Sequence, residues 1–386
     1  MGALAAAGIR AGALGFSTWR TTSHRSSSGE HIPTLTAGRD ELVGIASAIG
    51  ATGRGVLQVT ADASAGADEH EILLAKMRAS GLPLSVTLLQ YRGTDYRDKL
   101  ALLERANAEG LAMRAQIATR AVGVMLGLQT SMNPLLATPT YLEVADLPLA
   151  EQVRRLSTVD ARARLFGDLT TTPPRWSLDR VFDLGEIPDY EPEPAASVAE
   201  RARAAGVAAE EMLIDLLLQD GGTKLLYVAA VNYCDGDFAA ISEMLAHPHT
   251  IPGLSDGGAH VGIISDASFP TTLLSHWGRD RTRGRTFDVA FLVGQQCRAT
   301  AEAVGLRDRG VLLPGYKADL NVIDFERLGV SAPRMVCDLP AGGQRLLQDA
   351  HGYLHTVVSG VETYANGAST GELPGRLVRW NRANPR

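Results

Sequence analysis

Over its first 120 residues the chain alternates short apolar runs with amphipathic segments, and this alternation constrains the fold more than any other feature. The apolar runs are ALGFS (13–17), GVLQVT (55–60), LPLSVTLL (82–89) and LAMRAQIA (111–118). The segments between them have helical periodicity over 10–15 residues. Such pairs are typical of a β-strand followed by an α-helix on a parallel sheet, so we predict an α/β fold.

The rest of the chain keeps this rhythm only in part. Segments such as TTPPRW and IPDYEPEPA predict a long helical excursion near 121–220. The alternation returns with KLLYVAAV (224–231) and IPGLSD (251–256). After Gly305, short runs bounded by Gly, Pro and Asn predict a separate β layer. We therefore expect a βα domain over residues 1–304 and a β segment over 305–386.

The count of βα units limits the architecture. The pattern gives about six strands of this type, the last of which ends at Asp256. A closed barrel of parallel strands needs eight. We expect either an open sheet or an N-terminally incomplete (β/α)8 barrel that begins about two strands late.

Composition excludes several classes of protein. A net charge of −6 implies no general affinity for nucleic acid or anionic lipid, so we expect a small-molecule or protein partner. No apolar run approaches the roughly 18 residues of a membrane span. The three cysteines are scattered without CxxC spacing, which fits a reducing cytoplasm.

Four stretches carry a family resemblance. They are HPHTIPGLSDGGAH, FPTTLLSHWGRDR, GLRDRGVLLPGYKADLNVID and VVSGVETYANG. Together they resemble the N-acyl-D-amino-acid deacylase branch of the amidohydrolase superfamily. The resemblance implies a (β/α)8 TIM barrel, a small β-sandwich built from both ends of the chain, and one or two zinc ions. It also implies hydrolysis of the amide bond of an N-acylated D-amino acid.

Asp256 is the strongest catalytic candidate. It ends an apolar run and precedes Gly257 and Gly258, so a solvent-facing turn is the alternative. Active sites of such barrels lie at the carboxyl ends of the strands, where a carboxylate can take a proton from water and return it to a departing amine. The resemblance implies this general-base role for Asp256, together with contact to the metal.

The metal site departs from the family pattern. The family's paired-histidine motif (HxH) and its Cys or Glu ligand have no match in this chain. The strands where further histidines would stand hold Gln58, Gln90 and Gln116, and neutral amides are poor zinc ligands. The resemblance thus implies Zn²⁺ with a ligand set that is incomplete here. We interpret this as the absence of the family's N-terminal part.

Three further residues are candidates for substrate binding. His260 follows Asp256 by four residues and could orient a substrate, or it could be a loop histidine bonded to backbone. Asn232 follows the run at 224–231 and could donate a hydrogen bond to a substrate oxygen. Arg345 could clamp a substrate carboxylate in bidentate geometry, with a surface arginine as the alternative.

Other polar clusters favour structural interpretations. His247 and His249 precede a strand and should therefore lie on the face away from catalysis. The basic run at 279–285 is interpreted as a solvated loop. The polar loop at 17–31 contains His24 and should lie at the mouth of the barrel.

The sequence therefore predicts a cytoplasmic, metal-dependent amidohydrolase that cleaves N-acyl amino acids with Asp256 as general base. One alternative is a truncated, metal-poor barrel without activity, in which a homo-oligomer covers the exposed sheet edges. The other alternative is a small-ligand binding protein derived from this fold.

Overall fold

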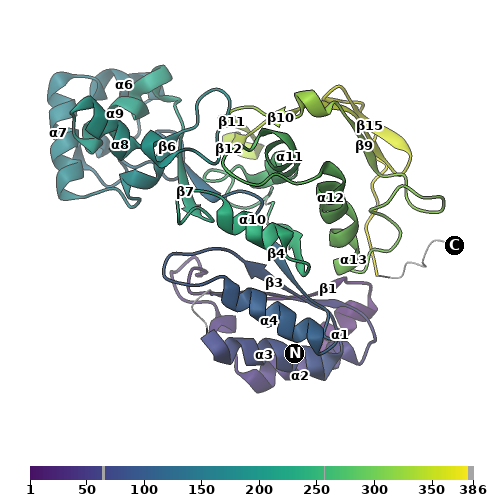
Figure 1. Cartoon of the computed structure of the whole chain (residues 1–386). Helices are drawn as coiled ribbons and strands as arrows, with labels where there is room; N and C mark the ends of the chain where they lie inside the picture. Colours follow the sequence, from purple (N-terminus) through teal and green to yellow (C-terminus); the bar gives the residue numbers. More distant parts are fainter. Residues whose placement is uncertain (63–65, 256, 381–386) are drawn as a thin grey trace.

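A parallel sheet of five strands organises the N-terminal half of the molecule (Figure 1). The computed structural model describes residues 1–62, 66–255 and 257–380. The strand order is β1-β2-β3-β4-β8, and each neighbouring pair is parallel. The strands are β1 (Gly15–Arg20), β2 (Val56–Ala61), β3 (Leu84–Leu88), β4 (Met113–Ile117) and β8 (Thr250–Pro252).

The helices of the N-terminal region lie together on one side of this sheet (Figure 1). They are α1 (Gly2–Arg10), α2 (Arg39–Gly50), α3 (Gly66–Ser80) and α4 (Arg97–Ala108). In α4 the buried residues Leu100, Leu103 and Ala106 recur every third position and form one apolar stripe. This stripe belongs to the same core cluster as Val59 and Val86 of the sheet. Burial of these apolar side chains is what fixes the helices to the sheet.

The prediction of a sixth parallel strand at 224–231 is wrong. This segment forms β7 (Leu226–Val231), which is the central strand of an antiparallel sheet with β5 (Val122–Leu126) and β6 (Val181–Asp183). In the parallel sheet β8 pairs directly with β4. An apolar run predicts a buried strand but carries no information on which strands it joins. Among the described residues the parallel sheet has five strands, which fits a TIM-barrel-like fold.

The expected helical excursion forms a lobe beside β6 and β7 (Figure 1). Its helices are α5 (Pro139–Leu142), α6 (Leu149–Leu156), α7 (Val159–Thr171), α8 (Val198–Ala205) and α9 (Ala209–Leu218). It has its own core, in which Leu165, Leu213 and Leu217 are buried with the inner face of β7. The excursion is thus a folded unit with a sheet of its own.

The second half of the chain returns to the parallel sheet and then becomes β structure. Four helices precede this change: α10 (Ala239–Ala246), α11 (Phe269–Ser275), α12 (Val289–Val293) and α13 (Thr300–Ala303). The strands that follow are β9 (Leu320–Ile323), β10 (Gly329–Val330), β11 (Arg334–Leu339), β12 (Gly343–Leu347), β13 (Ala350–His351), β14 (Tyr353–Val358), β15 (Val361–Ala365) and β16 (Ala368–Ser369). They form one four-stranded sheet, β16-β15-β14-β9, and two separate two-stranded pairs, β11-β12 and β10-β13. No helix in the described part of the chain is long and apolar enough to cross a membrane.

The face of the parallel sheet that points away from α2, α3 and α4 carries a neutral hydrogen-bonded network. The register places Ser17 beside Gln58 and Gln58 beside Ser85. Ser17 donates to Gln58, whose Nε2 donates to Thr60 Oγ1 at 3.2 Å. Further across the sheet, Gln116 Nε2 donates to Ser85 Oγ at 2.8 Å. We call these neutral side chains, with Thr87, the polar ladder; Thr87 Oγ1 lies 3.1 Å from Thr60 Oγ1.

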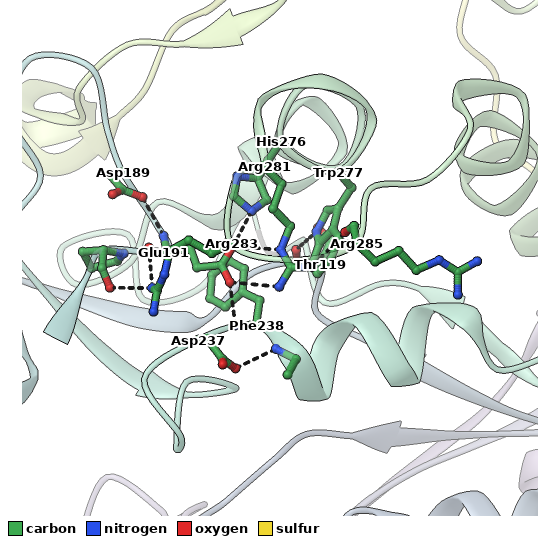
Figure 2. Close-up of polar contacts among 12 residues, drawn as sticks. Thr119, Asp189, Glu191, Asp237, Phe238, His276, Trp277, Arg281, Arg283 and Arg285 are labelled. Carbon is green, nitrogen blue, oxygen red and sulfur yellow. Dashed lines mark hydrogen bonds and ion pairs between the residues drawn. The ribbon is translucent and has the colours of Figure 1, made fainter.

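A buried carboxylate, Glu191, joins three parts of the chain (Figure 2). It lies in the segment between β6 and α8 and is 2 % exposed. Its Oε1 accepts from the backbone N–H of Phe238 at 2.8 Å and from Arg281 Nη2 at 3.0 Å. Its Oε2 accepts from Arg281 Nε at 3.0 Å and lies 2.9 Å from His276 Nε2. Glu191 therefore ties the excursion to the start of α10 and to the segment that follows α11.

The basic run at 279–285 is not the solvated loop that we expected. The Arg281 side chain is 2 % exposed and pairs with Glu191 in bidentate geometry. Arg283 donates to the carbonyls of Glu191, Pro192 and Gly236 at 2.9–3.0 Å. These arginines have acceptors on the excursion and on the turn before α10, and such contacts are not visible in the local sequence.

Hydrogen bonds to Glu191 determine the direction in which the pKa of its carboxyl is shifted. Burial would raise the pKa of this carboxyl, but donation from His276, Arg281 and the Phe238 N–H outweighs burial and lowers the pKa to about 2. The carboxylate is therefore charged in the folded protein throughout the neutral range.

Replacing Glu191 by glutamine should lower the free energy of unfolding by about 3 kcal/mol, because it leaves the buried guanidinium of Arg281 without its charge partner. Equilibrium urea unfolding followed by tryptophan fluorescence measures this change. The matched control is Glu193→Gln, whose 65 %-exposed side chain pairs with Arg283 and should change stability by less than about 0.5 kcal/mol. Equal effects of the two substitutions would contradict the prediction.

The stabilisation from Glu191 should also depend on pH. Its folded pKa of about 2 lies below the unfolded value of roughly 4.3, so the stabilisation is complete above the unfolded pKa and decreases as pH falls toward 2. The stability difference between the parent protein and Glu191→Gln should thus be constant near neutral pH and shrink below about pH 4. Urea unfolding at a series of pH values tests this, and a difference that stays constant down to pH 3 would refute it.

Candidate functional site at the carboxyl edge of the parallel sheet

The carboxyl ends of β1 and β2 bring a histidine and an aspartate together. Asp62 directly follows β2, and its Oδ2 accepts from the backbone N–H and the hydroxyl of Thr22 at 2.9 and 3.0 Å. His24 Nδ1 lies 2.9 Å from Thr21 Oγ1, and its ring packs edge-on against Trp19. Two threonines that follow β1 therefore hold both titratable groups at this edge.

His260 approaches the same place from the opposite edge strand of the sheet. Burial lowers the pKa of His24, and the nearby charge of His260 lowers it further, while Asp62 acts in the opposite direction. His260 follows β8, which lies at the far end of the strand order from β1. His24 and His260, in the loops after the two edge strands, are therefore near enough for their charges to interact, as expected when a parallel sheet curves into part of a barrel.

The loop that contains His260 is fixed by backbone contacts on both sides. Met125 N–H donates to Ile263 O at 2.8 Å, and Leu346 N–H donates to Val261 O at 2.6 Å. A Cβ at Gly262 would lie 2.6 Å from Ser131 Oγ, so glycine allows this close approach. The excursion and the β11–β12 hairpin thus hold this loop between them.

Asn232 connects the end of β3 with the end of β7. Its side chain is completely buried, and its backbone φ is +63°. Its Oδ1 accepts from Gln90 N–H at 2.7 Å, while its own N–H donates to Gln90 O at 3.1 Å. Among the described residues, Asn232 Nδ2 has no hydrogen-bond partner. The structure therefore places the predicted donor at the carboxyl edge with one unused N–H₂ group.

A buried arginine, Arg120, follows the end of β4. Its side chain is 1 % exposed and lies over the ring of Tyr190, with the guanidinium carbon 3.6 Å from the ring centroid. Its Nη2 donates to Ser265 O at 2.7 Å and lies 3.6 Å from Asp266 Oδ1. Arg120 therefore anchors the far end of the loop that follows β8.

Arg345 lies on β12 and pairs within its own hairpin. Its Nε and Nη2 donate to the two carboxylate oxygens of Asp338, both at 2.7 Å. Arg345 also lines a cavity of about 190 Å³ together with Gly257, Asp266 and Gln348. Arg345 is thus a partly exposed arginine whose bidentate partner in this structure is an aspartate of the protein.

The other predicted residues are placed as follows. Asp256 lies outside the described residues, four positions after the last residue of β8. His247 and His249 precede β8 at the opposite, amino edge of the sheet, where the two rings pack edge-on with centroids 5.6 Å apart. The structure therefore brings His260 and Asn232 to the carboxyl edge, and it leaves the histidine pair away from it.

Asp62 and Lys99 are titratable residues at this edge that were not among the predicted site residues. Asp62 has the same signal as Asp256, a carboxylate directly after an apolar strand, and could have been found from it. Lys99 is the second; its Nζ donates to Ala61 O at 3.4 Å and Thr87 O at 3.2 Å. Burial lowers the pKa of Lys99, while Asp62 and Glu69 act to raise it. Lys99 belongs to an amphipathic helix, so nothing in the sequence distinguishes it.

The described residues do not fit a zinc cage. The predicted ligand positions Gln58 and Gln116 belong to the polar ladder and already bond to hydroxyl groups. Within residues 1–62, 66–255 and 257–380, no group of three or more His, Cys, Asp or Glu side chains could hold a metal ion. Since zinc is bound by those four residue types, this face of the sheet offers mainly amides and hydroxyls, which zinc disfavours.

Comparison with protein families identifies the class of the molecule. The sequence model of a family described as the amidohydrolase family matches residues 1–364. This match covers nearly the whole chain, so the protein belongs to the amidohydrolase family, whose members are hydrolases. No curated protein and no solved structure gives a significant match.

The meeting of the two edge loops can be tested by histidine titration. We expect the ring of His24 to titrate below an exposed histidine, because burial and the charge of His260 both disfavour its protonated form. His260→Gln should raise the pKa of His24, whereas Asp62→Asn should lower it. Two-dimensional NMR of the ring protons, assigned with His24→Gln, measures these shifts. An unchanged His24 titration in His260→Gln would contradict the proximity of the two histidines.

Proposed function

We propose that this protein hydrolyses the carbon–nitrogen bond of N-acyl amino acids, with Asp256 as the general base. The observation that supports the proposal is membership of the amidohydrolase family, together with the SDGGAH segment of the sequence. In the sequence this segment begins three residues after the last residue of β8 and ends at His260, whose charge acts on His24 at the carboxyl edge of the sheet. Parallel α/β folds bind and transform their substrates at this edge.

In the proposed reaction a water molecule attacks the acyl carbonyl carbon. Asp256 removes a proton from the water as the new carbon–oxygen bond forms and the carbonyl oxygen takes up negative charge. When the carbon–nitrogen bond breaks, Asp256 returns the proton to the nitrogen. The products are a carboxylic acid and a free amine, so the proton is conserved within one catalytic cycle.

Neighbouring residues supply binding groups for such a substrate. The unused Nδ2 of Asn232 is a donor suited to a carbonyl oxygen. His260 and His24 can orient the amino-acid part from the two edge loops. Arg345 would receive the substrate carboxylate in place of Asp338, since both are planar anions that accept two parallel hydrogen bonds.

Zinc and the D-configuration of the substrate are implied by the resemblance to N-acyl-D-amino-acid deacylases. The described donor set does not fit zinc, and in the proposed reaction Asp256 carries out the proton transfers. A metal-dependent form of the reaction would need ligands beyond those described here. Both the D- and the L-form of the substrate are therefore tested.

The test is amine release from N-acetyl-D- and N-acetyl-L-amino acids, with and without added zinc. Asp256→Asn should reduce kcat by at least about a hundredfold, because a positioned general base contributes roughly 10²–10⁴ to the rate. The control Asp160→Asn, at the start of α7 in the excursion, should leave the rate unchanged. Turnover that persists in Asp256→Asn would remove that residue from the mechanism.

Absence of turnover with every substrate, with and without zinc, would refute the hydrolase proposal for this chain. A binding protein is the second candidate, favoured by the polar ladder and the unused Asn232 Nδ2. An increase in Tm with N-acetyl amino acids in the absence of turnover would support that candidate.

A further inference from the structure

Trp19 is a large apolar side chain at the carboxyl edge that has no part in the proposed reaction. It is the next-to-last residue of β1 and is 41 % exposed. Side chains alternate between the two faces of a strand, so Trp19 shares a face with Ser17, which bonds to the polar ladder. In the register it stands beside Thr60 of the ladder. An exposed indole therefore borders neutral polar groups, and an apolar surface with a polar surround is typical of a binding site.

The position of the indole is set by its neighbours. Its ring packs edge-on against the ring of His24, with the centroids 3.7 Å apart. The backbone of β1 is fixed at the same point, because Trp19 O accepts from Thr34 Oγ1 at 2.6 Å. The next residue, Arg20, pairs with the buried Glu69 of α3 at 2.8 Å. A side chain that is ordered before a ligand arrives loses less entropy on binding. Trp19 is thus a preorganised apolar surface.

Trp19 lies near the loop that follows β8. Burial lowers the pKa of His24, and the charge of His260 lowers it further, so these two histidines are near each other. The indole contacts His24 and therefore lies on the β1 side of the loop that contains His260. A substrate that binds at this loop has an aromatic side chain of β1 beside it.

Arg345 gives such a substrate a direction. This arginine, which the proposed reaction assigns to the substrate carboxylate, lies on β12, and the next residue, Leu346, donates its N–H to Val261 O at 2.6 Å. Trp19 and Arg345 thus approach the loop after β8 from different elements. In an N-acyl amino acid the carboxylate and the acyl group lie on opposite sides of the amide bond. With the carboxylate at β12, the acyl group extends away from Arg345 and toward the β1 side.

We infer that Trp19 is a specificity-determining residue, which binds the acyl group and selects N-acyl amino acids with an aromatic acyl group over N-acetyl amino acids. The inference rests on the proposed function, because Arg345 and Asp256 set the direction of the substrate. An aromatic acyl group such as phenylacetyl stacks on the indole and removes apolar surface of both rings from water, whereas the methyl group of an acetyl covers only part of the indole.

The kinetic test compares kcat/KM for N-phenylacetylalanine with kcat/KM for N-acetylalanine, each as a racemate, with and without added zinc. The ratio should favour the phenylacetyl substrate in the parent protein, and Trp19→Ala should lower it at least about fivefold. Trp19→Phe keeps an aromatic ring against His24 and should retain most of the preference. The matched control Tyr364→Ala removes an exposed ring from β15 and should leave the ratio unchanged. A ratio that is the same in Trp19→Ala and the parent would overturn the inference and leave the hydrolase proposal standing.

A binding measurement separates failure of this inference from failure of the hydrolase proposal. Isothermal titration of Asp256→Asn with N-phenylacetylglycine and N-acetylglycine needs no turnover. The phenylacetyl probe should bind at least about fivefold more tightly, and adding Trp19→Ala should remove this difference. That result would support the acyl site even if neither amide is hydrolysed by the parent. Equal affinity for the two probes, no binding of either probe, or a preference that persists with Trp19→Ala would overturn the inference.

Discussion

The pairing of Glu191 with Arg281 and His276 is the contact on which the arrangement of the excursion depends. A carboxylate that is 2 % exposed is stable only because four donors surround it, and these donors come from the turn before α10 and from the segment after α11. The segment that carries Glu191 also carries Tyr190, whose ring covers the guanidinium of Arg120 at the end of β4. A single buried charge thus helps to position the excursion and, through Tyr190, the guanidinium of Arg120 that bonds the loop after β8.

Curvature of the parallel sheet accounts for the composition of the candidate site. β1 and β8 are the outermost strands in the pairing order, yet His24 and His260 are close enough for one to influence the titration of the other. The carboxyl edge therefore forms an arc, and residues from its two ends face each other across it. The excursion and the β11–β12 hairpin hold the loop after β8 from opposite sides. The contacts are backbone hydrogen bonds donated by Met125 and Leu346.

Sequence patterns predicted the parts of this structure that depend on local order. The alternation of apolar runs and amphipathic segments predicted β1 to β4 with α2 to α4. It did so because strands and helices that are buried on a parallel sheet have periodic patterns of apolar residues in the sequence. The same reasoning failed for β7, since its apolar run suits any buried strand and its partners lie about 50 and 100 residues away. Arg281 and Arg283 were interpreted as solvated because their acceptors are distant in sequence. Asp62 was within reach of prediction from its place after a strand, whereas Lys99 was not.

The polar ladder has a consequence for how the carboxyl edge responds to its surroundings. Its members are serine, threonine and glutamine side chains, none of which gains or loses a proton between acid and alkaline extremes. The polar ladder therefore carries no charge at any pH at which the protein is folded, and its hydrogen-bond pattern does not depend on pH. Acid–base behaviour there originates in titratable side chains around the ladder, among them His24, Tyr91 and Lys99. A titration curve of the site would therefore report only the titratable side chains around the polar ladder, because the ladder itself does not change its charge.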